Sequence, residues 1–233
     1  MIKVNFGEKI VECEAPITVY EAARAGELVS RATLACEIGG EICALSKELN
    51  ADADVKLLTF ADEGGKHVFR HTASHVLAQA VKRLYPAAKL TIGPAIENGF
   101  YYDIDSEVAF SPELLAKIED EMKKIVKENL LIERFELPRE EAVKLMREKD
   151  EPYKVQLIEE LPEDAVISFY KQGEFTDLCA GPHLHSTGAV KAFKLTQCTG
   201  AYWKGDQNNK MLQRIYGVAF PAKDEMNAYL AAV

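Results

Sequence analysis

The sequence predicts an α+β protein in which a small strand-rich unit precedes a larger mixed unit. The first 60 residues alternate apolar and polar positions over short runs separated by turn residues, which is typical of strands. From Val68 onward, apolar residues recur instead at helical spacing over several longer segments. A polar segment with two glycines, residues 62–66, separates the two patterns. We therefore expect one domain over residues 1–62 and a second over residues 63–233.

The first unit is predicted to contain a hairpin, a helix, a second hairpin and a final strand. Thr18 is a side-chain cap for the helix, and Gly39-Gly40 is a typical turn of the second hairpin. The predicted elements are, in chain order, a hairpin at 2–13, a helix at 19–24, a hairpin at 34–44 and a strand at 55–59. This order is that of a β-grasp, or ubiquitin-like, module.

The larger unit is predicted to pack helices against an antiparallel sheet. Its first helix ends before Pro86, and Ser111-Pro112 opens a second helix with a capping hydroxyl followed by proline at the first helical position. The predicted elements are helices at 68–84, 112–126, 139–148 and 153–160, a strand at 101–105, a hairpin at 166–179 and closing strands at 192–197 and 212–220.

Composition limits the classes of protein to which the chain can belong. No apolar run approaches the ~18 residues of a membrane span, and the N-terminus lacks the apolar stretch of a signal peptide. Five scattered cysteines fit a reducing compartment, so we expect a cytoplasmic protein. The net charge of −9 argues against general nucleic-acid binding. Basic and aromatic residues nevertheless mix near the C-terminus, where Lys204, Lys210 and Arg214 form either a local RNA-facing surface or a solvated face.

Two short motifs contain the chemically versatile side chains. His71 and His75 are four residues apart on a predicted helix, so both imidazoles lie on one face. Cys179 and His183 flank a Gly-Pro turn, which can aim a thiol and an imidazole in the same direction. Three imidazoles and a sulfur directed at one point form either a metal site or a hydrolytic pocket.

Four motifs in this order resemble the editing domain of threonyl-tRNA synthetases. The first unit resembles the TGS domain that precedes editing in bacterial members, and the resemblance covers essentially all 233 residues. The motifs are Arg70-His71-Thr72-Ala73-Ser74-His75-Val76-Leu77-Ala78-Gln79-Ala80, Thr176-Asp177-Leu178-Cys179-Ala180-Gly181-Pro182-His183, Gly200-Ala201-Tyr202-Trp203-Lys204-Gly205-Asp206 and Met211-Leu212-Gln213-Arg214-Ile215-Tyr216-Gly217.

The resemblance implies hydrolysis of the ester in mischarged seryl-tRNA. Serine lacks one methyl of threonine, and a methyl in a pocket discriminates by only about 1–3 kcal/mol, so a second hydrolytic site restores accuracy. It implies a pocket of His71, His75, Lys154, Asp177, Cys179 and His183, with Gly93 and Tyr102 contacting substrate. The histidines would hold the terminal ribose or the attacking water. Lys154 would align water or stabilise the oxyanion, and Asp177 would receive the serine ammonium or orient an imidazole.

The resemblance implies no required cofactor and one macromolecular partner, the acceptor end of tRNA(Thr) bearing serine. Related alanyl-tRNA editing proteins use the positions of His71, His75, Cys179 and His183 for zinc, so a zinc ion stays the alternative. The family continues beyond Val233 into a class II catalytic core. We therefore expect aminoacylation, and a homodimer formed through that core, only of a longer parent, and a monomer of this chain.

Three other functions stay open on the sequence. The first is a non-catalytic tRNA-binding or regulatory module, since TGS modules also occur in nucleotide-signalling and GTP-binding proteins. The second is a freestanding deacylase acting in trans on alanyl-tRNA acceptors. The third is a nucleophilic pair, Cys179 with His183, that forms a covalent intermediate.

Overall fold

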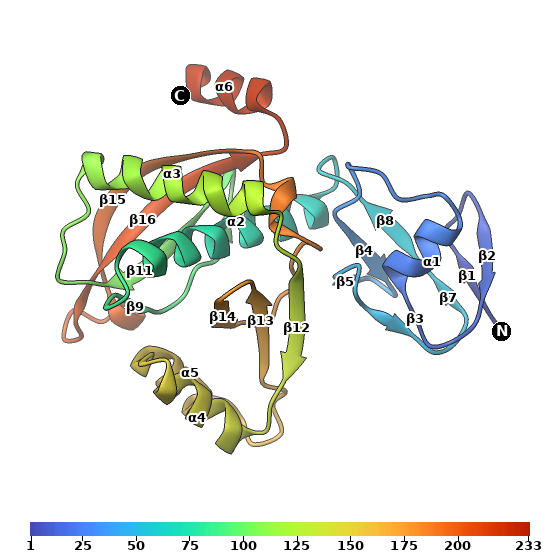
Figure 1. Ribbon diagram of the computed structural model, residues 1–233, viewed down its shortest axis with the longest axis horizontal. Coiled ribbons are helices and arrows are strands. Elements are labelled where there is room, and N and C mark those ends of the chain that lie inside the picture. The colour runs from blue at the N-terminus through green and yellow to red at the C-terminus, as the bar shows by residue number, and fades with distance from the viewer. The chain divides into compact units, whose positions relative to one another are not determined.

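The computed structural model describes all 233 residues, which divide into two compact units (Figure 1). The first unit comprises Met1–Phe69 together with Gly181–His185. The second comprises Arg70–Ala180 and Ser186–Val233. The mixed class with antiparallel sheets that the sequence predicts is confirmed. Each unit is described by itself below.

The first unit consists of short strands around one helix. Strand β1 pairs with β2 in an antiparallel hairpin and with β7 in parallel, whereas β4 lies between β5 and β8 in a second small sheet. Thr18 accepts the backbone N–H of Glu21 and caps the helix as predicted. The elements are β1 Ile2–Asn5, β2 Ile10–Cys13, β3 Ile17–Thr18, α1 Val19–Ala25, β4 Ala35–Ile38, β5 Glu41–Cys43, β6 Glu48–Leu49, β7 Ala53–Asp54 and β8 Lys56–Leu58.

The second unit has one large antiparallel sheet and one small one. The large sheet has the order β10-β11-β16-β15, with β9 also paired to β11, and the small sheet has the order β12-β13-β14. Helix α2, Glu63–Leu84, begins in the first unit and belongs to the second from Arg70 onward. The other elements are β9 Lys89–Leu90, β10 Ala95–Ile96, β11 Gly99–Asp105, α3 Pro112–Glu128, β12 Ile132–Glu136, α4 Arg139–Glu148, α5 Pro152–Glu160, β13 Ser168–Gln172, β14 Phe175–Leu178, β15 Ala192–Tyr202, β16 Met211–Phe220 and α6 Lys223–Ala232, with 3₁₀ turns at Thr187–Ala189 and Trp203–Gly205.

Helix α2 begins at Glu63, so the sequence prediction of a start at Val68 is wrong. The polar glycine segment that suggested a linker forms the first turn of the helix. A Cβ on Gly65 would lie 2.0 Å from the carbonyl oxygen of Thr59, so only glycine lets the helix start this close to the chain leaving β8. The glycines therefore serve packing here rather than flexibility.

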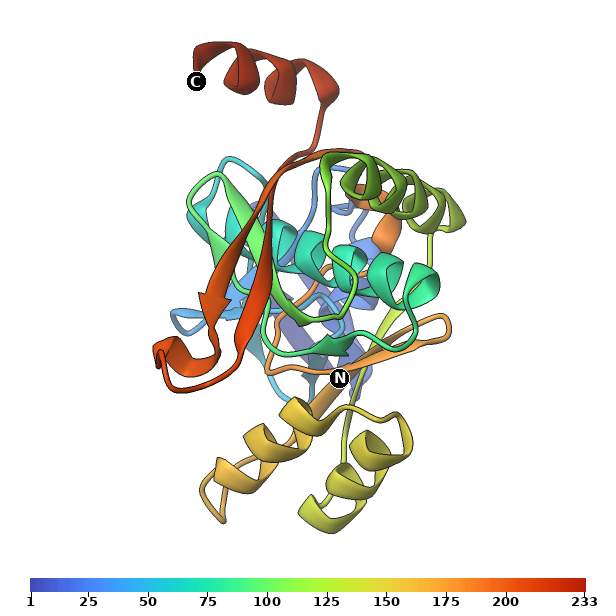
Figure 2. The ribbon, with the colours of Figure 1, turned by 90° about the vertical axis from the view of Figure 1, so that its left-hand side faces the viewer.

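Helices α4 and α5 lie side by side and pack with the small sheet (Figure 2). Their shared core is separate from that of the large sheet and consists of Ala142, Met146, Ile158, Ile167 and Phe169. The β13–β14 hairpin of the small sheet and helix α5 both contribute residues to the site described next. None of the helices is both long and apolar enough to cross a bilayer.

Candidate active site

A buried carboxylate, Asp177, forms the centre of the candidate site. Its Oδ1 lies 2.9 Å from the ammonium nitrogen of Lys154, and its Oδ2 accepts the hydroxyl of Tyr102 at 2.9 Å. Nδ1 of His75 lies 3.4 Å from the same Oδ2. The exposed fractions of Asp177, Lys154 and His75 are only 2%, 3% and 4%. Burial of a charge is tolerated only with partners of this kind, and here one cation balances one anion.

Four separate elements supply these side chains. Strand β14 alternates, so that Phe175 and Asp177 are both buried while Thr176 between them is only partly buried. Helix α2 supplies His75 and β11 supplies Tyr102. Lys154 lies in the first turn of α5, which the buried Glu151 fixes by accepting the ammonium of Lys82 and the backbone N–H of Leu90. Burial is the main cause that raises the pKa of Glu151.

The neighbours of His75 favour one protonation state and one tautomer of its imidazole. Burial lowers its pKa well below the ordinary value, and the nearby His71 and Lys154 lower it further. The ring is therefore neutral near pH 7. With Nδ1 facing Asp177, the proton belongs on Nδ1, because that nitrogen can then donate to the carboxylate. Nε2 then bears the lone pair of the neutral ring, as required of a proton acceptor or of a metal ligand.

A second pair lies one turn before His75 on α2. Nε2 of His71 lies 3.3 Å from Sγ of Cys179, the residue that follows β14. The rings of His71 and His75 meet edge to face with centroids 5.1 Å apart. One ligand atom each from His71, His75, Cys179 and His183 lie within 4.8 Å of one another. The structure thus brings together both motifs that the sequence singled out.

The donor chemistry of this group fits zinc. Three imidazoles and one thiolate are a known tetrahedral set, and the contact between His75 and Asp177 is the kind of outer hydrogen bond that orients a ligating imidazole. Ligands of one zinc ion stand about 3.5 Å apart, so the four atoms would have to close slightly around it. The charges at the site give no further support for a bound cation, because Lys154 already neutralises Asp177. Bound zinc would supply a Lewis acid or, with four protein ligands, a structural cross-link.

Gly93 and Tyr102 are held against each other beside Asp177. A Cβ on Gly93 would lie 2.1 Å from Cδ2 of Tyr102, so only glycine fits beside this ring, and contact of Gly93 with substrate stays a prediction. The carbonyl of Gly93 accepts the hydroxyl of Ser74 at 2.6 Å. Tyr102 is fully buried, and burial together with Asp177 raises the pKa of its hydroxyl well above the ordinary value. In this structure the Tyr102 hydroxyl therefore donates its hydrogen bond to Asp177. Direct contact of Tyr102 with substrate stays a prediction.

The three cations predicted to bind tRNA are all ion-paired within the chain. Lys204 pairs with Glu160, and Lys210 lies 2.9 Å from Oδ1 of Asp105. Arg214 binds both carboxylate oxygens of Asp103, at 2.7 and 2.9 Å, and its guanidinium lies 4.0 Å from the ring centre of Tyr101. Phosphate contact by any of them stays a prediction. Such contact would have to compete with these carboxylates.

Sequence reasoning gave no role in the site to several residues that support it. Trp203, which lies in the third sequence motif, is buried and packs edge to face on Tyr153, the neighbour of Lys154, and its indole N–H donates to Gln156. Glu151 was missed, although its place directly before Pro152 marks it as the residue that begins a helix. Gln79 lies in the first motif, four residues after His75, but no role was assigned to it.

One segment of the site matches a known protein family. Residues 167–216, which include β13, β14 and the cysteine after them, match the family described as "Threonyl and Alanyl tRNA synthetase second additional domain". That region contains Asp177. The family match thus covers the carboxylate at the centre of the site and the hairpin that presents it.

Whole-chain relatives are threonine–tRNA ligases. The chain is 60% identical over 232 residues to that of Clostridium tetani, 56% identical over 232 residues to that of Clostridium kluyveri and 58% identical over 235 residues to that of Acetivibrio thermocellus. These matches cover 99 to 100% of this chain. The chain spans only 36 to 37% of the length of these relatives.

Proposed function

We propose that the larger unit hydrolyses the ester of mischarged seryl-tRNA and thereby proofreads threonine–tRNA ligation. The observation that supports this most directly is the buried Asp177 with Lys154, Tyr102 and His75 around it. Asp177 itself lies in the segment that matches the synthetase second additional domain. Hydrolysis needs an oriented proton acceptor and a positive charge near the developing oxyanion. The neutral His75 and the buried Lys154 offer these two functions.

In the proposed reaction, water attacks the ester carbonyl that joins serine to the terminal ribose. A water proton passes to Nε2 of His75, whose Nδ1–H is held by Asp177. Lys154 stabilises the tetrahedral oxyanion. The C–O bond to the ribose then breaks, and the leaving ribose oxygen takes up the proton from His75. Serine and uncharged tRNA are the products. Asp177 orients the imidazole in this scheme, since its contacts leave it poorly placed to receive the serine ammonium.

Single-turnover deacylation by the 233-residue chain tests this proposal. We expect the rate of hydrolysis of seryl-tRNA(Thr) to be at least about 100-fold higher than that of threonyl-tRNA(Thr). In Lys154→Ala, the rate for seryl-tRNA(Thr) should fall by about 10²–10³-fold, the size expected for removal of an oxyanion donor. Lys171→Ala changes an exposed lysine of β13 and is the matched control. Equal rates for the two substrates, or for Lys154→Ala and the unmodified chain, would contradict the proposal.

One observation supports a covalent route as second candidate. The 3.3 Å between Cys179 and His71 is a nucleophile–base distance, so His71 is a candidate base beside the His183 expected from sequence. A seryl thioester on Cys179 would form by loss of the ribose oxygen and would then be hydrolysed. Mass spectrometry after rapid acid quench distinguishes the routes. A serine adduct that disappears in Cys179→Ala favours the covalent route, and its absence favours direct attack by water.

We further propose that the reaction needs no metal. The balanced charges of Lys154 and Asp177 support this, because no uncompensated anion at the site calls for a cation. Metal analysis of protein purified without chelator decides the point. One zinc per chain that is lost in His71→Ala would refute the metal-free site.

For the rest of the chain we propose a TGS-type β-grasp module over residues 1–62 and a cytoplasmic location. The β1–β2 hairpin, the helix α1 and the parallel pairing of β1 with β7 support the β-grasp assignment, and five free cysteines support a reducing compartment. Threonine–tRNA ligation, a dimer formed through a catalytic core and the whole-protein partners belong in this proposal to a longer parent chain.

A further inference from the structure

We propose that Gln79 and Gln172 are positioning residues: their mutual hydrogen bonds fix the register between helix α2 and the β13–β14 hairpin and so hold His75 against Asp177. The inference deepens the proposed function and rests on it for its catalytic consequence. Neither glutamine touches the four-residue group of His71, His75, Cys179 and His183 in any contact described above. Both are nonetheless nearly inaccessible, with exposed fractions of 0% and 2%.

Helix α2 presents four side chains at intervals of four residues, and each meets the same hairpin. Four residues of helix advance ~6 Å. Two residues of strand advance ~6.6 Å, so the two spacings nearly match. The contacts in order are His71 with Cys179, His75 with Asp177, Gln79 with Gln172, and Arg83 with Glu174. Gln172 is level with Phe175 across the hairpin, which places it two residues beyond Asp177 in the same progression.

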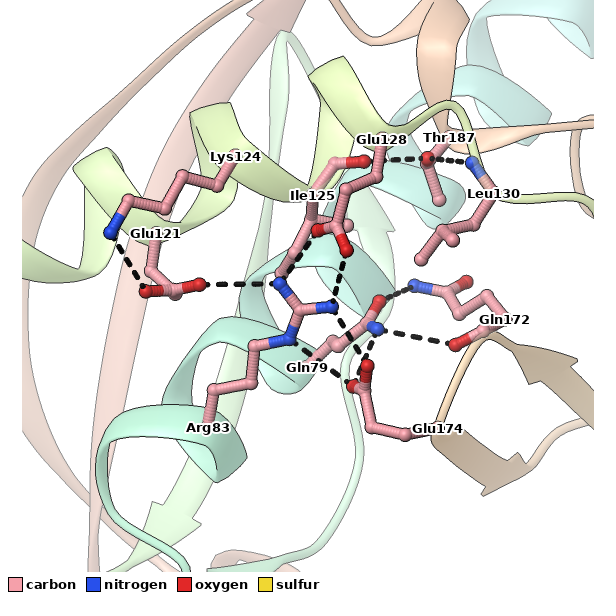
Figure 3. Close-up of polar contacts among 10 residues, drawn as sticks. All are labelled: Gln79, Arg83, Glu121, Lys124, Ile125, Glu128, Leu130, Gln172, Glu174 and Thr187. Carbon is pink, nitrogen blue, oxygen red and sulfur yellow. Dashed lines mark hydrogen bonds and ion pairs between the residues drawn. The ribbon is translucent and has the colours of Figure 1, made fainter.

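The Gln79–Gln172 contact is specific in direction (Figure 3). Nε2 of Gln172 donates to Oε1 of Gln79 at 2.7 Å, while Nε2 of Gln79 donates to the backbone carbonyl of Gln172 at 3.2 Å and to Glu174 at 2.7 Å. Apolar packing is non-directional and tolerates small sliding movements. A buried amide pair does not, because any slip leaves donors and acceptors unsatisfied at about 1–3 kcal/mol each. The pair therefore selects one register.

Arg83 fixes the far end of the row. It donates to both carboxylate oxygens of Glu174 at the hairpin turn and also to Glu121 and Glu128 of α3 (Figure 3). The turn is thus tied to two helices. Arg83 holds the turn, and the glutamine pair holds β13. Strand β14, which contains Asp177 and is followed by Cys179, therefore has little freedom to shift along α2.

The double variant Gln79→Leu/Gln172→Leu tests the positioning role. It replaces both side-chain amides by apolar groups of similar size, so neither amide is left with an unpaired partner amide. The backbone carbonyl of Gln172 and the carboxylate of Glu174 each lose one donor, and Glu174 keeps its bonds from Arg83. We expect kcat for seryl-tRNA(Thr) deacylation to fall by about 10- to 100-fold, the effect of misplacing a reacting group by ~1 Å, with KM within about 3-fold of the unmodified chain. Thr187→Val is the matched control. It removes two buried hydrogen bonds, to Leu130 and Ile125, in the neighbouring segment and leaves α2 untouched (Figure 3).

A second readout separates positioning from general loss of structure. The ¹⁵N chemical shifts of the His75 ring report which nitrogen bears the proton. At constant pH we expect an Nδ1–H tautomer in the unmodified chain and in Thr187→Val, and a mixed state in the double variant.

Two results would contradict the positioning role of Gln79 and Gln172. Unchanged ring shifts in the double variant would overturn the inference, whatever happens to kcat. Shifted ring signals with full activity would equally overturn a role in the reaction. An unmodified chain that hydrolyses no seryl-tRNA would refute the proposed function instead, and the ring shifts would still decide whether the glutamines position His75.

Discussion

Removal of the buried cation in Lys154→Met should be among the most destabilising single changes in the larger unit. Lys154 and Asp177 lie 2.9 Å apart with exposed fractions of 3% and 2%. At an effective dielectric constant of ~20, their attraction is about 332/(20 × 2.9), or about 6 kcal/mol. Methionine restores part of this by apolar packing, so a net loss of about 3–5 kcal/mol is expected, as for other buried pairs broken on one side.

Urea unfolding at pH 7, followed by the fluorescence of Trp203, measures this loss in the larger unit, because Trp203 is the only tryptophan. With an m value of about 2–3 kcal/mol/M, the midpoint should fall by more than about 1 M. Lys154→Met/Asp177→Asn removes both charges and should regain at least about half of the loss, since a neutral pair needs no compensation. If Lys154→Met costs less than about 1 kcal/mol, the lysine is not held as a buried cation, and the electrostatic argument fails.

Three further predictions address other parts of the unit. Folding lowers the pKa of His75, so below pH ~6.5 its imidazole is protonated in the unfolded chain but stays neutral in the folded chain. The free energy of unfolding therefore decreases as the pH falls. Between pH 7.5 and 5.5 the unmodified chain should lose about 1 kcal/mol more unfolding free energy than His75→Gln, and parallel losses would contradict the assigned neutral ring. Gly93→Ala should cost about 1–3 kcal/mol by displacing Tyr102. It should cost more than Gly205→Ala, whose Cβ would meet nothing within 4 Å and whose cost comes only from the backbone φ of +69°. Lys204→Ala should lower the salt dependence of tRNA binding by about one unit of slope if the lysine contacts phosphate, as a filter-binding titration would show; an unchanged slope would confine Lys204 to its pair with Glu160.

Elements with strong local signals could be predicted from the sequence. The bounds of α4 match the prediction, and the cap by Ser111 and the proline after it mark the start of α3. Short strands such as β9 and β10 were not predicted, because two residues give no periodicity and their pairing with β11 depends on the folded sheet. The start of α2 was predicted wrongly because glycine is ambiguous. Close packing and a loose linker favour the same residue.

Several candidate residues that the sequence singled out lie close together in the structure, but the contacts between them could not be predicted. His71 and Cys179 are recognisable from their motifs, and the structure brings them into contact. That Lys154 is buried against Asp177 follows from packing between α5 and β14, and no local pattern signals it. The resemblance to a family supplied Lys154 as a candidate, whereas its surroundings required the fold.

The place of Lys154 within α5 has a consequence for how this protein can change over generations. The lysine occupies the third position of a helix that begins at Pro152, where the helix dipole disfavours positive charge. A matched apolar pair in place of Lys154 and Asp177 would remove that penalty and the cost of burying two ions. Selection for heat resistance alone should therefore replace the two residues together and yield more stable proteins that lack the proposed hydrolytic activity. Persistence of the pair in a lineage would then record continuous selection for the function of this site.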